Sequence, residues 1–463
     1  MDSLQELEYH ASELGTAVQD LARHIIRSNE FRANSASRPI IDTQNPDEVN
    51  QARKGVLSHI ARIKTLVCAP TEFLEHLASQ TEMLACLRWL GKTQILACIP
   101  RIGSVPIKDV ANLAGVEETQ LCRVVRLTAT GGFLKEDPRG HVGHTALSDP
   151  FFSNPLLLDA AMFMAESAAP AALNMAITDA NSVKGTHPSA YDLALNTWTP
   201  FHIACEQNPR LSRQYSAYLQ YAAGLHVMDG FADVLKQLCW SNISQACVVE
   251  VGAHSTATAR KLAELYPNLR FVVQLIDPAS LETSHRRQLR PLLKLARAAP
   301  TFDADLSPHI TVAARTLGSR QTTTDADVYI VHLPSNSSST VLAELQLHRD
   351  ILRASNAIML IPTAHLLPEP GSTVDPEAEA VARSRDLGLL QLVNEREMEL
   401  AELLDMIDTV KDSAGKLAVT KRLHSSSNLV VALVIKYQME DADNPQGKKN
   451  GFKARTFSSG QSY

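Results

Sequence analysis

The sequence has little net charge, no signal-like start and no obvious membrane-spanning run. Its 463 residues carry a net charge of only −6, so charge alone gives no reason to expect nucleic acid or a membrane surface as the partner. The first ten residues, MDSLQELEYH, are acidic and lack the apolar centre of a secretory signal. We expect no apolar run long enough to cross a bilayer. With 45% apolar and 20% charged residues, the composition is that of a soluble globular protein, long enough for about two or three domains.

Cysteines are few and are not spaced as metal ligands. None of the seven belongs to a C-x-x-C pair; they are Cys68, Cys86, Cys98, Cys122, Cys205, Cys239 and Cys247. We therefore expect reduced, mostly buried thiols in a protein of the cytosol or nucleus, and no metal site.

The N-terminal segment, residues 1–45, begins with an apolar heptad pattern. Apolar residues alternate at steps of three and four, at Leu4, Leu7, Ala11, Leu14, Val18, Leu21 and Ile25. This spacing predicts a helix with one apolar stripe. The stripe could pack on the protein's own domain, or it could pair with another chain, because three heptads are near the lower limit for a coiled coil.

Residues 46–155 predict a helical domain that ends in a winged helix. Two short helices, one of them stopped by Gly115, precede a hairpin that turns at Asp137-Pro138-Arg139-Gly140. The second helix offers Arg123 and Arg126 but begins with Glu117-Glu118. Because DNA readers present a basic face, we expect no direct DNA binding.

The C-terminal half alternates strand-like and helix-like segments. After a helical connection at residues 156–240, residues 241–438 contain the apolar runs CVVEVG, RFVVQLI, HITVAA, DVYIVHL, AIMLIP and NLVVALVIKY, with helical patterns between the runs. This order predicts a doubly wound, Rossmann-like domain, so the fold class is mixed α and α/β. The polar tail at residues 439–463 is predicted to be disordered, and its basic residues from Lys448 to Arg455 could form a weak nuclear signal.

One loop has the outline of a nucleotide-cofactor site. The stretch VVEVGAHSTATARKL, residues 248–262, reads as a strand, a tight turn and the start of a helix. Such turns usually carry two or three glycines, whereas this one has only Gly252. Glycines there allow close backbone approach and positive φ.

Several motifs together resemble the class I small-molecule O-methyltransferases, which join a winged-helix dimerisation domain to an S-adenosylmethionine-binding domain. The resemblance covers about residues 85–437 and rests on TALSDPFF, NPRLSRQYSAYLQ, VVEVGAHSTA, LLPEPG and LLQLVNEREMELAELL. In this chain, Glu250 and Gly252 match the family's D/E-x-G-x-G-x-G turn, but His254 and Thr256 replace the next two glycines. At a left-handed position a Cβ costs about 1–2 kcal/mol.

The other cofactor positions that the resemblance implies are also altered. The acid that holds the ribose is replaced by Leu275, with Asp277 two residues further on. The acid near the adenine is replaced by Thr316, or by Arg315 if the register slips by one. We therefore expect a degenerate site and no bound cofactor, with S-adenosylmethionine as the cofactor only if the chain is an active enzyme.

The catalytic base of the family, a histidine in an H-D-W-like motif, has no counterpart. The matching segment reads LPSNSS, with His332 earlier, still in a strand, and His348 later, where we expect a surface position. Glu397 keeps one of the two flanking acids, and Ala364 replaces the other. We expect no catalytic residues; the alternative reading assigns catalysis to His332, or to His254, with Glu397 beside it.

Within this family, the chain resembles the co-regulators of fungal aromatic-polyketide clusters of the aflatoxin, sterigmatocystin and anthraquinone type. The resemblance implies a non-catalytic co-activator that acts with a zinc-cluster transcription factor in nucleus and cytoplasm. The alternative is an active O-methyltransferase on a phenolic polyketide. The resemblance also implies a winged-helix homodimer without membrane contact, with Leu87, Trp89, Leu90 and Ile95 near the contact. The heptad residues of the first helix are the second expected interface.

Overall fold

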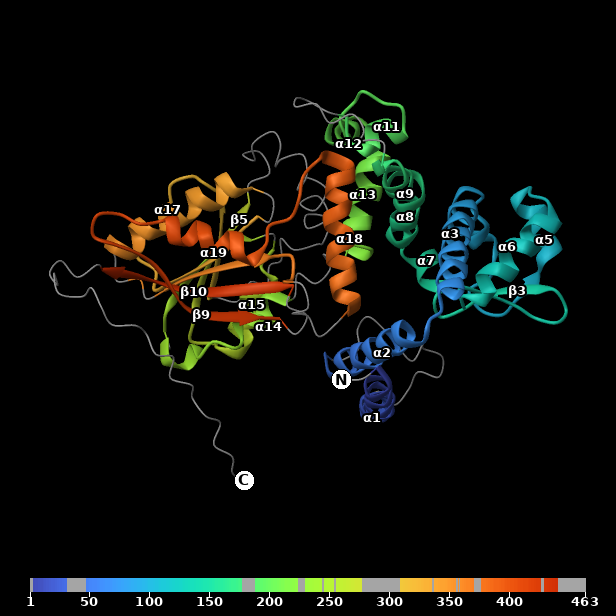
Figure 1. The fold of residues 1–463 in the computed structure, drawn as a ribbon, viewed down its shortest axis with the longest axis horizontal. Helices are drawn as coiled ribbons and strands as arrows, with labels where there is room; N and C mark the ends of the chain where they lie inside the picture. Colours follow the sequence, from blue (N-terminus) through green and yellow to red (C-terminus); the bar gives the residue numbers. More distant parts are fainter. Residues whose placement is uncertain are drawn as a thin grey trace.

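The computed structural model contains three regions (Figure 1). The Rossmann-like sheet lies at one end, the winged helix lies at the other, and a layer of helices joins them. The described residues are 3–30, 47–176, 188–223, 230–243, 245–253, 255–276, 309–334, 337–354, 357, 359–369, 376–425 and 429–439.

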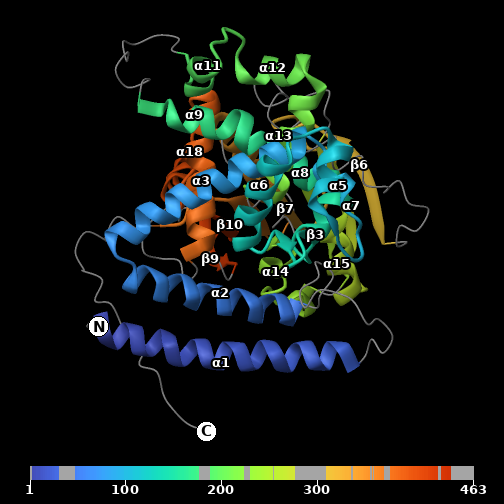
Figure 2. The ribbon, with the colours of Figure 1, turned by 90° about the vertical axis from the view of Figure 1, so that its right-hand side faces the viewer.

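The first two helices form an antiparallel pair. Helix α1 (Ser3–Glu30) packs along α2 (Asp47–Val67) and lies outermost, with α2 between it and the body of the protein (Figure 2). The rings of His10 and His59 approach to 3.1 Å between their Nδ1 atoms, and His24 Nδ1 lies 3.2 Å from Glu48 Oε2. Four of the seven residues of the predicted stripe are half-buried in this pairing, namely Leu7, Leu14, Leu21 and Ile25, while Leu4, Ala11 and Val18 are exposed.

The winged helix is present as predicted. Its elements are α3 (Pro70–Lys92), α4 (Ile95–Cys98), β1 (Val105–Pro106), α5 (Ile107–Ala114), α6 (Glu118–Thr130), β2 (Leu134–Glu136), β3 (His141–His144) and α7 (Asp149–Ser153). The three strands form a sheet in the order β1-β3-β2. Gly115 ends α5 in the left-handed conformation, with φ +65°.

The connecting layer is helical. It comprises α8 (Pro155–Phe163), the π-helix η1 (Met164–Ala168), α9 (Ala169–Leu173), α11 (Ala190–Ala194), α12 (Phe201–Gln207) and α13 (Pro209–Tyr221). From the other end of the sequence, α18 (Pro376–Val393) packs into this layer beside α9, α11 and α12. The layer is therefore built from two distant parts of the chain, which the division at residues 156–240 did not anticipate.

One segment of this layer corrects the expectation about apolar runs. Among the described residues there is one helical stretch, Pro155–Leu173, that is long enough and apolar enough to cross a bilayer by length and composition. One side of it packs in the connecting layer, where its Phe163 is fully buried against Phe201 and Tyr215. Its Asp159 accepts a hydrogen bond from Arg213 Nε at 2.6 Å.

The C-terminal domain is a seven-stranded sheet in the order β6-β5-β4-β7-β8-β10-β9. The strands are β4 (Cys247–Ala253), β5 (Arg270–Ile276), β6 (Ile310–Arg315), β7 (Val328–His332), β8 (Met359–His365), β9 (Gly415–His424) and β10 (Val430–Met439). Neighbouring strands from β6 to β8 are parallel, and β10 runs antiparallel to both β8 and β9. The helices are α14 (Gly230–Leu235), the 3₁₀ turn η3 (Trp240–Ile243), α15 (Ala257–Leu265), α17 (Ser338–Ala354) and α19 (Leu400–Thr409).

All six predicted strands occur, and β9 is a seventh that the sequence reading missed. Its sequence, GKLAVTKRLH, is rich in basic residues because β9 is the outer strand beside β10. Two further details differ from expectation. His348 is buried rather than on the surface, and of the seven unpaired cysteines only Cys86 and Cys205 are buried while Cys239 is exposed.

Candidate functional site

The carboxyl ends of the parallel strands bring the predicted cofactor residues to one edge of the sheet. Glu250 and Gly252 lie on β4, Leu275 on β5, and Thr316 directly follows β6. This edge is where open α/β sheets bind ligands. His254, Asp277 and the Asn336 region lie outside the described residues.

Gly252 adopts a glycine-specific conformation, which the other described residues of the turn do not share. Its φ is +72°, and a Cβ built there would lie 3.0 Å from the carbonyl oxygen of His332 and 3.0 Å from Leu317 Cδ2. The pairing of β4 with β5 shifts register between Val251 and Ala253, so that Gly252 forms a small irregularity against β5. Glycine is therefore needed at position 252 because the protein's own chain, at His332 and Leu317, lies so close.

Thr256 corrects one expectation about strain. It stands at the N-cap of α15 with φ −86°, an ordinary value, and is 9% exposed. The cost of a Cβ in the left-handed region therefore does not apply at this position, although the side chain still occupies volume beneath the turn.

Glu250 is bonded to His332 across the two central strands. His332 Nε2 lies 2.7 Å from Glu250 Oε1, and Thr363 Oγ1 lies 2.7 Å from His332 Nδ1. The two contacts suit a ring whose Nε2–H donates to the carboxylate while Nδ1 accepts from the threonine hydroxyl. Both ring nitrogens are then occupied. Glu250 is 1% exposed, and its Oε2 has no hydrogen-bond partner among the described residues.

The ribose end of the site is apolar. Leu275 is half-buried, pairs with Ala253 and Ala314 in register and packs against the core on one side of the sheet. A leucine side chain offers no acceptor for a pair of hydroxyl groups.

The adenine end contains a buried ion pair. Arg315 is the last residue of β6, and its Nη1 lies 2.9 Å from Glu344 Oε1 on α17; the two side chains are 3% and 0% exposed. The same carboxylate accepts from the backbone N–H of Gly318, and Arg315 Nη2 also donates to the carbonyl oxygen of Ser319. The loop after β6 is thus tied to α17 by its own side chains.

Glu397 has a structural role. Its carboxylate forms a two-point ion pair with Arg385 of α18, with Nη2 and Oε2 at 2.7 Å, and both side chains are 4% exposed. Arg385 Nη1 also donates to the carbonyl oxygen of Ala223 at 3.0 Å. Glu397 therefore joins the start of α19 to the connecting layer. The pairing offered by the alternative reading, His332 with Glu397, does not occur, because His332 bonds to Glu250 and Thr363.

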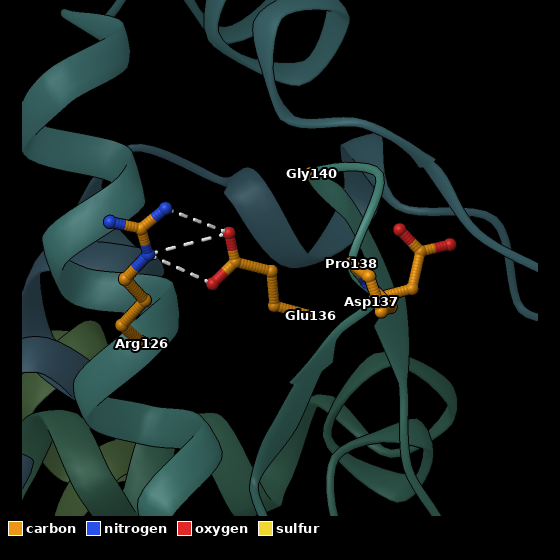
Figure 3. A pocket seen from close by; sticks show the side chains of 5 residues that line it. All are labelled: Arg126, Glu136, Asp137, Pro138 and Gly140. Atoms are coloured by element: carbon orange, nitrogen blue, oxygen red, sulfur yellow. Dashed lines mark hydrogen bonds and ion pairs between the residues drawn. The ribbon is translucent and has the colours of Figure 1, made fainter.

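The DNA-facing features of the winged helix neutralise one another. Arg126 of α6 forms a two-point ion pair with Glu136 of β2, with Nε and Oε2 at 3.0 Å. Figure 3 shows this pair at a surface pocket lined also by Asp137, Pro138 and Gly140. The second basic residue, Arg123, lies on the helix whose N-cap is Glu117. One of the two arginines of this helix is therefore paired within the wing.

The predicted interface residues on α3 and α4 divide into two groups. Leu90 and Ile95 are 0% exposed within the winged-helix core, so they cannot contact a second chain directly. Leu87 and Trp89 are half-buried beside the same core. The apolar residues of α3 that are exposed were not predicted: Phe73, Leu74 and Leu77. Among the described residues, no group of His, Cys, Asp and Glu side chains could hold a metal ion.

The fold is that of the S-adenosylmethionine-dependent O-methyltransferases. The chain is similar to the mitomycin 7-O-methyltransferase MmcR, with a TM-score of 0.53 and 18% identity over 80% of this chain and 98% of that one. It is also similar to LepI in complex with S-adenosylmethionine, with a TM-score of 0.58 and 13% identity over 92% of this chain and all of that one. At such identities, the likeness concerns the fold alone.

Sequence relatives identify the family. Residues 4–68 match the model of the N-terminal domain of the trypacidin cluster transcriptional coactivator tpcD. The chain is 47% identical to the transcriptional coactivator nsrH of Aspergillus novofumigatus, over 95% of this chain and 99% of that protein. It is 41% identical to the monodictyphenone cluster transcriptional coactivator mdpA of Emericella nidulans, over 95% and 99%. The chain belongs to this family of fungal secondary-metabolite cluster transcriptional coactivators, which confirms the resemblance seen in the sequence.

Proposed function

We propose that the protein is a non-catalytic coactivator of an aromatic-polyketide gene cluster, which acts on a zinc-cluster transcription factor through protein contacts and binds no methyl donor. The observation that carries this proposal is the bond between His332 and Glu250 beside a Gly252 turn packed against its own chain. Glu250 Oε1 and both ring nitrogens of His332 have partners within the chain, and this speaks against a role of these atoms in holding a ligand.

The residues at the edge do not fit S-adenosylmethionine. The methionine end of the cofactor would meet the Gly252 turn, which already packs closely against His332 of β7. The ribose would meet the apolar side chain of Leu275, and the adenine would meet the ion pair of Arg315 with Glu344. Dividing that pair would leave a buried charge uncompensated, which typically costs about 3–5 kcal/mol.

Among the described residues, the candidates for a base in methyl transfer are already paired, whereas His254 lies outside that part of the chain. A general base needs an unshared nitrogen lone pair within reach of the substrate hydroxyl. Both nitrogens of His332 have partners, and Glu397 is held by Arg385. These contacts speak against the alternative of an active O-methyltransferase on a phenolic polyketide.

The partner and the location belong to the same proposal. The Arg126–Glu136 pair reduces the basic face that DNA binding requires, which favours contact with a DNA-bound protein over contact with DNA itself. A coactivator of this kind is made in the cytoplasm and acts in the nucleus. We also propose a homodimer, because an isologous two-fold contact is the commonest form of association.

Calorimetric titration with S-adenosylmethionine and with its demethylated product tests the proposal. We expect no heat of binding up to millimolar ligand. Low-micromolar binding of either compound would contradict it. A pull-down of the cluster's zinc-cluster transcription factor by the full-length protein tests that interaction separately. Its result does not depend on the outcome of the titration.

A further inference from the structure

Helix α1 carries a second apolar face that does not touch α2. Three of its large residues, Leu4, Val18 and Ile26, are 62%, 47% and 59% exposed. The residues between them on the same side are small and also exposed, namely Ala11, Gly15 and Ala22. At about 100° per residue these six fall within an exposed stripe roughly 80° wide, which borders the half-buried row of Leu7, Leu14, Leu21 and Ile25. We name the six residues the outer stripe.

The outer stripe faces away from the rest of the described protein. Helix α2 is the main neighbour of α1 among the described elements. Both views place α1 at the outside of the molecule with α2 behind it (Figures 1 and 2). An apolar helix face of this length is unusual on a surface unless another molecule covers it.

Gly15 marks the centre of the outer stripe. Leu4 lies eleven residues before it and Ile26 eleven residues after it. A Cβ built on Gly15 would have no heavy atom within 4 Å, so nothing in the chain itself requires a glycine there. Glycine in the middle of a helix is unfavourable relative to alanine, but it lets a second helix approach the backbone closely. The stripe thus has large residues at both ends and its narrowest point at the middle.

The charges beside the outer stripe differ between the two halves of α1. The first half has the exposed Glu8 at the edge of the stripe, and the second half has the exposed Arg23 and Arg27 on the same flank. Within the helix, Arg23 Nη1 also lies 2.7 Å from Asp20 Oδ1. A second copy of α1 running in the opposite direction would place Glu8 beside Arg23 of that copy at both ends. A parallel copy would instead place like charges side by side.

We propose that the outer stripe pairs antiparallel with the outer stripe of a second copy of this chain, on a two-fold axis that passes near Gly15. The arrangement is self-complementary, because each Leu4 lies against Ile26 of the other copy and the two glycines meet at the axis. This inference rests on the homodimer in the proposed function and specifies its contact.

A cysteine cross-link in the full-length protein tests the geometry. Gly15→Cys should give a covalent dimer under mild oxidation, because the two residues meet at the axis. Ile26→Cys is the matched control on the same stripe, and it should not cross-link to itself, since two such residues lie roughly 33 Å apart in the antiparallel pair. A mixture of Leu4→Cys and Ile26→Cys proteins should form a mixed dimer. The wild-type protein, oxidised alongside, gives the contribution of the native cysteines.

Sedimentation of charge variants gives a second measurement. Glu8→Lys and Arg23→Glu should each raise the dimer dissociation constant about tenfold, and the double variant should restore it, because two exposed pairs change from attraction to repulsion in each single variant. The control is Phe73→Ser with Leu77→Ser, which alters an equally exposed apolar surface on α3 and should leave the constant unchanged.

Each other outcome overturns the inference in a distinguishable way. A stable dimer without a Gly15→Cys cross-link removes this contact and keeps the homodimer. A wild-type monomer at micromolar concentration removes both. Self-cross-linking of Ile26→Cys indicates a parallel pair. Loss of the dimer in the α3 variant assigns the contact to α3. A fall in transcription-factor binding in the Glu8 and Arg23 variants with an unchanged dimer assigns the outer stripe to the factor.

Discussion

His332 and Glu250 lie on neighbouring parallel strands and are joined by a 2.7 Å contact between Nε2 and Oε1. The ring is fixed from the other side by Thr363 and packs against Phe231, with ring centroids 4.8 Å apart. In this arrangement the acid of the methyl-donor turn and the nearest histidine have one another as partners. The pair gives both residues a structural role within the O-methyltransferase fold.

The first prediction concerns this pair. His332→Ala should destabilise the Rossmann-like domain by about 3–5 kcal/mol, because it leaves the Glu250 carboxylate buried without a partner. Adding Glu250→Leu should recover much of the loss, since the uncompensated charge is then removed. Thermal unfolding of the single and double variants measures both effects. Equal stability of His332→Ala and the wild type would mean that the contact contributes nothing to folding.

The second prediction separates two reasons for a glycine at position 252. Gly252→Ala should cost about 1–2 kcal/mol for the left-handed backbone alone, and more for the contacts of 3.0 Å with His332 and Leu317. Gly318→Ala is the matched control, because Gly318 has φ +80° but open space around it. Gly318→Ala should lower the free energy of unfolding only by the cost of the left-handed backbone. Denaturant unfolding compares them, and equal losses would show that the packing against β7 is unimportant.

The overall architecture could be predicted because its signals are local. Strand-length apolar runs alternate with helical periods, and the Gly115 stop and the Asp137–Gly140 turn mark the winged helix. The loss of family residues at the sheet edge could likewise be read from the motif positions. The basic outer strand β9 escaped because its alternation is broken by charged residues, which edge strands tolerate.

The partners of the site residues could not be predicted, because they come from distant parts of the chain. Arg315 meets Glu344, and Arg385 meets Glu397, only after the sheet and helices have packed. The burial of His348 depends on the same packing, since its ring lies against Tyr329 of β7. Leu90 and Ile95 are buried in the winged-helix core, and their place near a dimer contact stays a prediction, because apolar periodicity on a helix does not say whether the stripe faces its own core or another chain.

The third prediction compares a buried and an exposed ion pair. Arg315→Ala should cost about 3–5 kcal/mol, because Glu344 is fully buried and would lose its charged partner. Arg126→Ala breaks a pair of similar geometry on the surface of the wing, where Arg126 is 67% exposed, and should cost less than about 1 kcal/mol. Urea unfolding of both variants provides the comparison. A similar cost for the two would show that the Arg315 pair is not needed to hold the loop after β6.

The fourth prediction follows from His348. Burial lowers the pKa of this imidazole below its ordinary value of 6.5, although the neighbouring Glu344 opposes the shift. Below pH 6.5 the unfolded chain therefore binds a proton that the folded chain refuses. Stability should be complete above pH 6.5 and fall as the pH drops, by up to about 1.4 kcal/mol per pH unit for this group, until the folded pKa is reached.

The variant His348→Leu isolates that contribution. It removes the titrating group and loses the 2.8 Å contact between Nδ1 and the Glu344 carbonyl oxygen, while Nε2 has no hydrogen-bond partner among the described residues. Unfolding measured between pH 7 and pH 5 should show a shallower slope for the variant than for the wild type. Parallel pH profiles for the two proteins would contradict the prediction.

The fifth prediction concerns the face of α1 that packs on α2. Leu14 and Leu21 are half-buried between the two helices, so Leu14→Asp with Leu21→Asp places two charges in that contact, at a cost of roughly 2–6 kcal/mol. Because α1 has α2 as its main neighbour, we expect α1 and α2 to separate while the Rossmann-like domain stays folded, and coactivation to fall with them. Hydrogen exchange resolved by segment, together with a reporter for the gene cluster, measures the two effects. The control, Tyr9→Asp with Thr16→Asp, adds the same charges on the exposed side of α1 and should change neither. If coactivation survives the separation of the helices, the N-terminal pair is not an interaction surface; if the whole protein unfolds, the contact is part of the common core.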